Sequence, residues 1–139
     1  MGVDYGDVRT GLAVSDKTEL LASPVTVIKQ RDPDMLADEI ADYAENLSAE
    51  LIVVGLPKNM DSSEGDRAKK CREFAGLLQS KTGIDCVMRD ERLSTVSAHV
   101  ALNNTNTRGQ KRKDIIDSVS AVMILQDYLD YRKNHVSEA

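Results

Sequence analysis

The chain has 139 residues, of which 41% are hydrophobic and 29% are charged, and its formal net charge is −5. These values are typical of one globular domain with its own core, so we expect a single domain over residues 1–139. The negative charge disfavours a protein that coats nucleic acid through bulk attraction, but it is compatible with a nuclease that has an acidic centre and a local basic rim.

Neither a membrane segment nor a zinc site is expected. No apolar run is long enough to span a bilayer, and the N-terminus lacks a secretory pattern, so we expect a cytoplasmic protein. Cys71 and Cys86 match no zinc motif and are expected to be buried, reduced thiols. His99 and His135 add no pair at helical spacing.

Three short apolar segments begin the chain, at residues 1–4, 9–15 and 21–28. Turn-rich stretches separate them, which predicts three strands. Links this short allow only antiparallel neighbours. Pro24 lies inside the third segment and marks it as an edge strand.

A helical period follows these strands. Apolar residues recur at intervals of four, three and four, which predicts one buried helical face formed by Leu36, Ile40, Tyr43 and Leu47. Pro33 suits the first turn of this helix, and Asp32 suits its N-cap. The next run, 51–54, is apolar throughout, as in a parallel strand that is covered on both faces.

A long loop over residues 55–65 separates this strand from a second helix, expected over 66–80. Its inward face is predicted to consist of Ala68, Cys71, Ala75 and Leu78. The alternation of Ile84, Cys86 and Met88 predicts another edge strand.

The remaining chain is expected to be helical, with one polar interruption. A short helix starts near Ser94, a polar stretch covers 103–109, and a final helix covers 114–131. Residues from 132 onward are expected to form a frayed, disordered tail. The order of elements predicts an α/β domain with a ribonuclease H-like mixed sheet. Three antiparallel strands are joined by two parallel strands, and helices cover both faces.

Three acids on three different elements form the candidate catalytic centre. Asp4 ends the first strand, Glu91 follows the last strand, and Asp117 shares a face of the final helix with Ala121 and Ile124. Two hard cations about 4 Å apart can activate a water and stabilise the leaving oxygen of a phosphodiester. Carboxylates suit such cations. The acids therefore predict a nuclease centre that holds Mg²⁺ or Mn²⁺.

Each acid also has a purely structural interpretation. Asp4 can close an Asx-turn, Glu91 can be an exposed charge at a strand end, and Asp117 can be an acid favoured by the helix dipole. Asp114 is a competing ligand and the better N-cap of the final helix.

Basic and hydroxyl residues near these acids are the candidate nucleic-acid contacts. Arg9 follows Asp4, and Ser94 and Thr95 offer hydroxyl and backbone N–H groups to a phosphate. The densest basic cluster precedes the final helix and contains Arg108, Lys111, Arg112 and Lys113. A second basic group contains Lys58, Arg67, Lys69 and Lys70. A solvated helix start is the alternative interpretation of such charge runs. The low aromatic content favours backbone and shape recognition over base stacking.

Four segments together resemble a known family. GVDYGDVRTGLAVSD, VVGLPKNMDSSEG, DERLSTVSA and KRKDIIDSVSAVMILQDYL are similar to the YqgF/RuvX-type proteins, which are relatives of Holliday-junction resolvases named as pre-16S rRNA nucleases. The resemblance covers residues 1–131 and implies a ribonuclease H-like fold, a divalent metal and maturation of the 5′ end of 16S rRNA. It places the family's acidic triad on Asp4, Glu91 and Asp117. The family's first strand usually begins a few residues earlier, so a short first strand is expected here.

Four functions are compatible with these residues. The first is a metal-dependent endonuclease on structured RNA, with precursor rRNA as its partner, acting as a monomer or weak homodimer. The second is a resolvase of branched DNA, which needs a two-fold dimer. The third is an ATPase of the actin or Hsp70 type, which would need a second such domain. The fourth is a non-catalytic module that binds RNA or the ribosome.

Overall fold

The computed structural model describes residues 1–57, 65–90 and 109–136. Within the last of these ranges, side chains are described for residues 119–133.

A five-stranded mixed sheet forms the centre of the molecule, with the spatial order β3-β2-β1-β4-β5. The strands are β1 (Gly2–Asp4), β2 (Arg9–Ser15), β3 (Ala22–Lys29), β4 (Ile52–Leu56) and β5 (Cys86–Asp90). The first three strands are antiparallel neighbours, whereas β4 is parallel to both β1 and β5. The predicted fold class is thereby confirmed, as are the short first strand and the edge position of the strand that contains Pro24.

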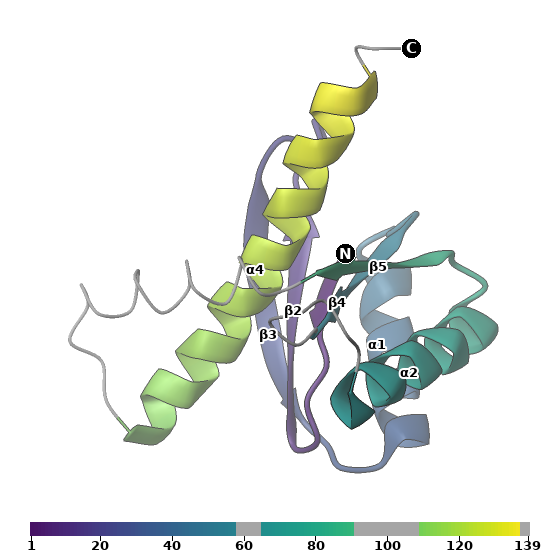
Figure 1. The fold of residues 1–139 in the computed structure, drawn as a ribbon, viewed down its shortest axis with the longest axis vertical. Coiled ribbons are helices and arrows are strands. Elements are labelled where there is room, and N and C mark those ends of the chain that lie inside the picture. The colour runs from purple at the N-terminus through teal and green to yellow at the C-terminus, as the bar shows by residue number, and fades with distance from the viewer. Residues whose placement is uncertain (58–64, 91–108, 137–139) are drawn as a thin grey trace.

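Helices cover both faces of this sheet (Figure 1). α1 (Pro33–Asn46) and α2 (Asp66–Thr82) pack together on one face, and α4 (Gly109–Val136) crosses the other. Two apolar clusters result. The first joins Val3 and Leu12 to α1 and α2, and the second joins Ala13 and Val53 to α4. None of the described helices is long and apolar enough to cross a membrane.

β1 lies so close to α4 that it requires a glycine. A Cβ added at Gly2 would lie 2.8 Å from both the Ala121 carbonyl oxygen and the Leu125 Cβ. Val3, the next residue, belongs instead to the cluster on the other face. Because side chains alternate along a strand, Asp4 lies on the same face as Gly2, which is the face that α4 crosses.

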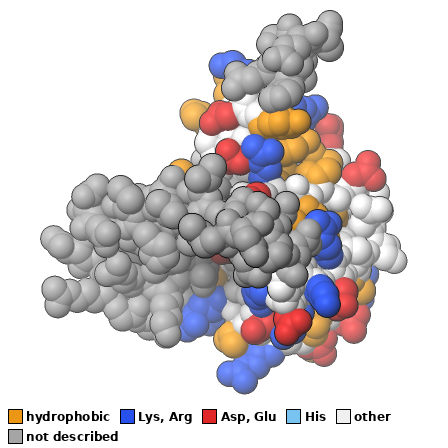
Figure 2. All heavy atoms as spheres, in the orientation of Figure 1, with side chains coloured by type: hydrophobic (Ala, Val, Ile, Leu, Met, Phe, Trp, Pro, Cys, Tyr) orange, Lys and Arg blue, Asp and Glu red, His pale blue; other side chains and the backbone are white. Residues whose placement is uncertain are grey.

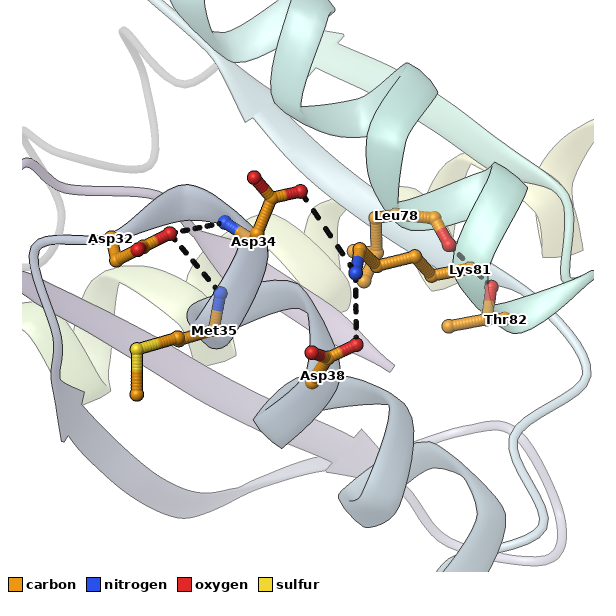
Figure 3. A network of polar contacts seen from close by, with 7 residues as sticks. All are labelled: Asp32, Asp34, Met35, Asp38, Leu78, Lys81 and Thr82. Carbon is orange, nitrogen blue, oxygen red and sulfur yellow. Dashed lines mark hydrogen bonds and ion pairs between the residues drawn. The ribbon is translucent and has the colours of Figure 1, made fainter.

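α1 begins as predicted, but its buried face is different. The Asp32 carboxylate accepts hydrogen bonds from the Asp34 N–H at 2.9 Å and the Met35 N–H at 3.3 Å, which confirms the N-cap (Figure 3). The prediction for two residues of the apolar face is wrong, because Tyr43 is 36% exposed and Leu47 is 39% exposed. The inward face consists of Leu36, Ala37, Ile40 and Ala44. Two of these four residues are alanines, which let α1 approach its neighbours closely.

α4 is longer than predicted at both ends. It begins at Gly109, so the basic residues 111–113 belong to its first turns and do not precede it. It continues to Val136, so the expectation of a frayed tail from residue 132 is wrong for residues 132–136.

The two cysteines are free thiols in different environments. Cys71 is buried in α2 as predicted, whereas Cys86 is only half-buried at the start of β5. The edge position of β5 accounts for the partial exposure of Cys86, because one side of an edge strand has no neighbouring strand.

Candidate active site at the carboxyl edge of the sheet

Asp4 occupies the position that the sequence predicts for it. It is the last residue of β1, pairs with Gly11 of β2, and is partly buried. β1 is the middle strand of the sheet, so Asp4 lies at the carboxyl edge near its centre. Open α/β sheets commonly bind their ligands at this edge.

The turn after Asp4 is held from inside by Gly6 and Thr10. The Gly6 N–H donates to the Oγ1 of Thr10 at 3.2 Å, and the Thr10 side chain is fully buried. A Cβ at Gly6 would lie 2.0 Å from the Arg9 carbonyl oxygen. The turn can therefore close only with glycine at this position, which explains the spacing of Asp4 and Gly6 in the sequence.

The same turn is held from outside by α2. The Arg67 Nη1 donates to the Oδ1 of Asp7 at 2.8 Å, and its Nη2 donates to the Tyr5 carbonyl oxygen. The Tyr5 ring stacks on Phe74 of α2, with ring centroids 4.2 Å apart and planes 4° from parallel. Burial raises the pKa of the Tyr5 phenol, although the charge of Arg67 opposes this shift. The sequence shows Arg67 only as one cation of a basic group and gives no signal for Tyr5.

The carboxyl end of β5 reaches the same edge as Asp4. Val3 of β1 pairs with Val54 of β4, and Leu56 of β4 pairs with Asp90 of β5, all in parallel register. Glu91 comes directly after Asp90 in the chain. Glu91 itself lies outside the described residues, as do Ser94, Thr95 and Arg108.

The third candidate acid, Asp117, is a residue of α4. Asp117 comes one helical turn before Ala121, the residue whose carbonyl oxygen meets Gly2. The predicted apolar face of this helix is confirmed, because Ala121 and Ile124 are fully buried. The side chain of Asp117 lies outside the described part of the structure, as do those of Asp114, Lys111, Arg112 and Lys113.

Arg9, a predicted phosphate contact, begins β2 at the same edge of the sheet. It is partly buried and pairs with Lys29, the last residue of β3. Two cationic residues therefore lie side by side on neighbouring strands, two residues beyond the pair formed by Asp4 and Gly11. The sequence prediction did not include Lys29, because the pairing register that brings it beside Arg9 cannot be read from composition.

The match to a family model decides the relationship of this chain to known proteins. The model described as "RuvX: Holliday junction resolvase" matches residues 1–131. The chain belongs to the RuvX family. The expected family is thereby confirmed, and so is the enzyme class, since this is a family of nucleases.

Relatives of similar length share about two fifths of their residues with this RuvX-family chain. A protein of Halothermothrix orenii is 43% identical over 95% of this chain and 94% of its own length. Proteins of Clostridioides difficile and Agathobacter rectalis are 42% and 37% identical, and each alignment covers 96% of this chain with 95% and 96% of the relative. All three carry the name "Putative pre-16S rRNA nuclease".

Solved structures share the fold of this RuvX-family chain. Thermus thermophilus RuvC in complex with a Holliday junction substrate has a TM-score of 0.61 at 16% identity, with 96% of this chain and 94% of that chain covered. The fowlpox virus resolvase in complex with Holliday junction DNA has a TM-score of 0.54 at 10% identity, with 94% and 95% covered. These similarities confirm the ribonuclease H-like architecture.

A second arginine connects the edge strand of this RuvX-family chain to α4. The Arg89 Nε donates to the Oδ2 of Asp127 at 2.6 Å, and the Arg89 Cζ lies 4.6 Å from the centroid of the Tyr131 ring. Arg89 therefore faces α4, as does Val87 two residues earlier in β5. This connection fixes the end of β5, two residues before Glu91, against the helix that carries Asp117.

Of the three metal ligands predicted for this RuvX-family site, Asp4 lies among the described side chains. Among the side chains that the structure describes, no three His, Cys, Asp or Glu residues gather in a metal-binding group. Two of the three candidate ligands fall outside those side chains, and the third, Asp4, lies at the expected edge. A set of three carboxylates fits Mg²⁺ or Mn²⁺ and does not fit a soft cation.

Acidic and basic side chains are mixed on the described part of one face of the molecule. Figure 2 shows Lys and Arg interspersed with Asp and Glu on the face that it draws. The described part of this face therefore offers no broad field of one sign.

Proposed function

We propose that this RuvX-family protein is a metal-dependent endonuclease that cleaves structured RNA, and that it matures the 5′ end of precursor 16S rRNA. The observation that carries the proposal is that β1 and β5 end at the same edge of the sheet with only β4 between them, while α4 covers one face of that sheet. The names of the relatives support rRNA as the substrate. Such a substrate places the enzyme in the cytoplasm.

The strand geometry supports a shared site for Asp4 and Glu91. β4 alone separates β1 from β5, and neighbouring strands lie about 4.8 Å apart, so their ends lie roughly 10 Å from each other. Carboxylates extending from both ends can reach cations between them. A hydrogen bond between Gly6 and Thr10 closes the turn after Asp4, so closure of the turn does not depend on Asp4 alone.

The direction of α4 supports Asp117 as the third ligand. Met1, the residue that precedes β1, lines a cavity together with three residues of this helix: Leu125, Tyr128 and Leu129. Ala121 and Leu125 meet Gly2. Moving along β1 toward Asp4 therefore corresponds to moving along α4 toward lower residue numbers, and Asp117 is the next residue of this face before Ala121.

The chain's own residues have three roles in this proposal. Asp4, Glu91 and Asp117 bind Mg²⁺ or Mn²⁺, which supplies a nucleophilic water and stabilises the leaving oxygen. Arg9, with Lys29 beside it, holds the RNA backbone at the edge of the sheet. Ser94, Thr95 and Arg108 are further proposed phosphate contacts, together with three cations in the first turns of α4: Lys111, Arg112 and Lys113.

Cleavage of a precursor 16S 5′-end RNA by wild type and Asp4→Asn tests this function. Reactions with Mn²⁺, with Mg²⁺ and with EDTA are compared. We expect metal-dependent cuts from wild type and none from Asp4→Asn. Circular dichroism should show that both proteins are folded. Cuts by wild type in EDTA would reject the metal requirement, and normal cutting by Asp4→Asn would reject the ligand assignment.

A Holliday-junction resolvase is the second candidate, because the matching family model carries that description. This activity needs two copies related by a two-fold axis, so that both strands are cut symmetrically. For RNA cleavage we propose a monomer or weak homodimer. Sedimentation with and without a four-way DNA junction tests this second candidate, since a protein that stays monomeric on the junction cannot resolve it symmetrically.

A further inference from the structure

The start of α2 contacts the turn that follows Asp4 through one side chain. Arg67 reaches two acceptors on this turn, the Asp7 carboxylate at 2.8 Å and the Tyr5 carbonyl oxygen. Its Cζ also lies 5.3 Å from the centroid of the Tyr5 ring. One guanidinium therefore contacts both the backbone and the ring of the residue directly after Asp4.

α2 holds Tyr5 at a second point as well. Phe74 lies seven residues after Arg67, about two helical turns along the same face, and stacks on the Tyr5 ring at 4.2 Å. The ring is therefore fixed by Phe74, and the peptide between Tyr5 and Gly6 is fixed by Arg67. Without Arg67, the stacked ring would remain but the peptide would lose its donor.

We propose that Arg67 is a positioning residue that sets the orientation of Asp4 for metal binding. The inference rests on the proposed function, in which Asp4 is a metal ligand. Inside the turn, Gly6 donates to Thr10, and outside it Arg67 donates to Tyr5, so the backbone beyond Asp4 is held from both sides. Partners that orient metal ligands typically change metal affinity by about 10- to 100-fold when they are removed.

Arginine suits this position better than lysine because its donors form a planar fork. The two Nη atoms reach different acceptors while the same plane contacts an aromatic ring. A lysine has a single ammonium on a flexible stem and can reproduce one of these contacts at a time. The structure therefore predicts that lysine at this position restores the function only in part.

A purely stabilising role fits the exposure of these groups less well. The side chains of Arg67 and Asp7 are 38% and 67% exposed, and ion pairs at such sites contribute little to the free energy of unfolding. Direct binding of the RNA phosphate by Arg67 also fits less well, because its Nη1 and Nη2 atoms each already donate to a protein acceptor.

Binding of Mn²⁺ beside Asp4 tests the proposal without requiring cleavage. Paramagnetic broadening of the Gly6 and Gly11 amide signals is followed by NMR during a Mn²⁺ titration. The variants are Arg67→Gln, Arg67→Lys and the matched control Lys81→Gln, which removes another cation of α2 that pairs with Asp38 at 3.0 Å. We expect Arg67→Gln to need about tenfold more Mn²⁺ and Arg67→Lys to need about threefold more. Lys81→Gln should behave as wild type.

Several results would overturn the proposal. These are an unchanged Mn²⁺ titration in Arg67→Gln, an equal change in Lys81→Gln, or the absence of broadening at Gly6 in wild type. If Arg67→Gln does not fold, an unchanged titration in Arg67→Lys has the same consequence. A change confined to the KM for RNA would identify a substrate contact instead.

The proposed function can fail separately. If wild type cleaves no RNA while the titrations differ as expected, the nuclease proposal is rejected and the role of Arg67 is retained. If wild type cleaves and the titrations are equal, only the role of Arg67 is rejected.

Discussion

Gly2 of β1 packs directly on Leu125 of α4, and a Cβ added at Gly2 would lie 2.8 Å from the Leu125 Cβ. This contact sets the distance between the middle strand of the sheet and the helix that carries Asp117. Asp4 is two residues further along the same face of β1. The separation between Asp4 and Asp117 therefore depends on the contact between Gly2 and Leu125.

The first prediction concerns the close contact at Gly2. Gly2→Ala forces α4 away from β1 and should lower the free energy of unfolding by about 1–3 kcal/mol, because the contact atoms include backbone of α4. Gly76→Ala is the matched control, since a Cβ there meets nothing within 4 Å, and it should stabilise α2 by about 0.5–1 kcal/mol. Urea unfolding measures both. Equal effects of the two variants would contradict the packing described here.

The second prediction concerns the N-cap of α1. Asp32→Ala removes the acceptor of two backbone N–H groups and should cost about 1 kcal/mol of unfolding free energy. Asp38→Ala breaks the exposed hydrogen bond and ion pair to Lys81 at 3.0 Å and should cost less unfolding free energy than the loss of the cap (Figure 3). Thermal melts at equal ionic strength compare them. A larger loss in Asp38→Ala than in Asp32→Ala would count against the cap.

The third prediction is a dependence of stability on alkaline pH. Burial, with a smaller contribution from Asp85, raises the pKa of the Cys86 thiol from its ordinary value of 9.0 to about 11. Between these values the unfolded chain has lost this proton while the folded chain keeps it, so stability falls as pH rises through this window.

Because Cys86 is only half-buried, we expect the loss to be about 1–2 kcal/mol. The measurement is the difference in unfolding free energy between wild type and Cys86→Ala at pH 8 and pH 11. Lysines and tyrosines titrate in both proteins and cancel in this difference. A difference that stays constant with pH would show that the thiol is not protected.

The fourth prediction concerns the turn after Asp4. Gly6→Ala places a Cβ 2.0 Å from the Arg9 carbonyl oxygen, so the turn must open and Asp4 must move. Metal-dependent cleavage should fall at least tenfold, as expected when a group that orients a ligand is disturbed. Gly83→Ala, at a left-handed position that ends α2, should lower stability by about 1 kcal/mol without changing cleavage per folded molecule. Loss of cleavage in both variants would indicate a general folding defect.

The sequence predicted the strands and their relative directions well because their physical signals are local. The short links after residues 4 and 15 allow only antiparallel pairing, and the continuous apolar run of β4 fits a strand that is buried on both faces. Pro24 located an edge for the same kind of reason.

The features that it missed depend on distances between elements. Ala37 and Ala44 face inward on α1, where the hydrophobic period favoured the larger Tyr43 and Leu47. The roles of Arg67 and Arg89 arise from the carbonyl group, carboxylates and rings that the fold brings beside them. Neither the composition of the chain nor the spacing of its residues predicts those contacts. For Asp4 the predicted position at the carboxyl edge of the sheet is confirmed, whereas the convergence of Asp4, Glu91 and Asp117 stays a prediction.

The most direct test of the central claim compares Asp117→Asn with Asp114→Asn in cleavage of a precursor 16S 5′-end RNA. Both substitutions remove one carboxylate from the first turns of α4, but Asp117 lies one turn before Ala121, the residue that meets Gly2, whereas Asp114 lies about two turns before it. We predict that Mn²⁺-dependent cuts disappear in Asp117→Asn and persist in Asp114→Asn. Persistent cutting by Asp117→Asn, together with loss in Asp114→Asn, would contradict the assignment of the third ligand.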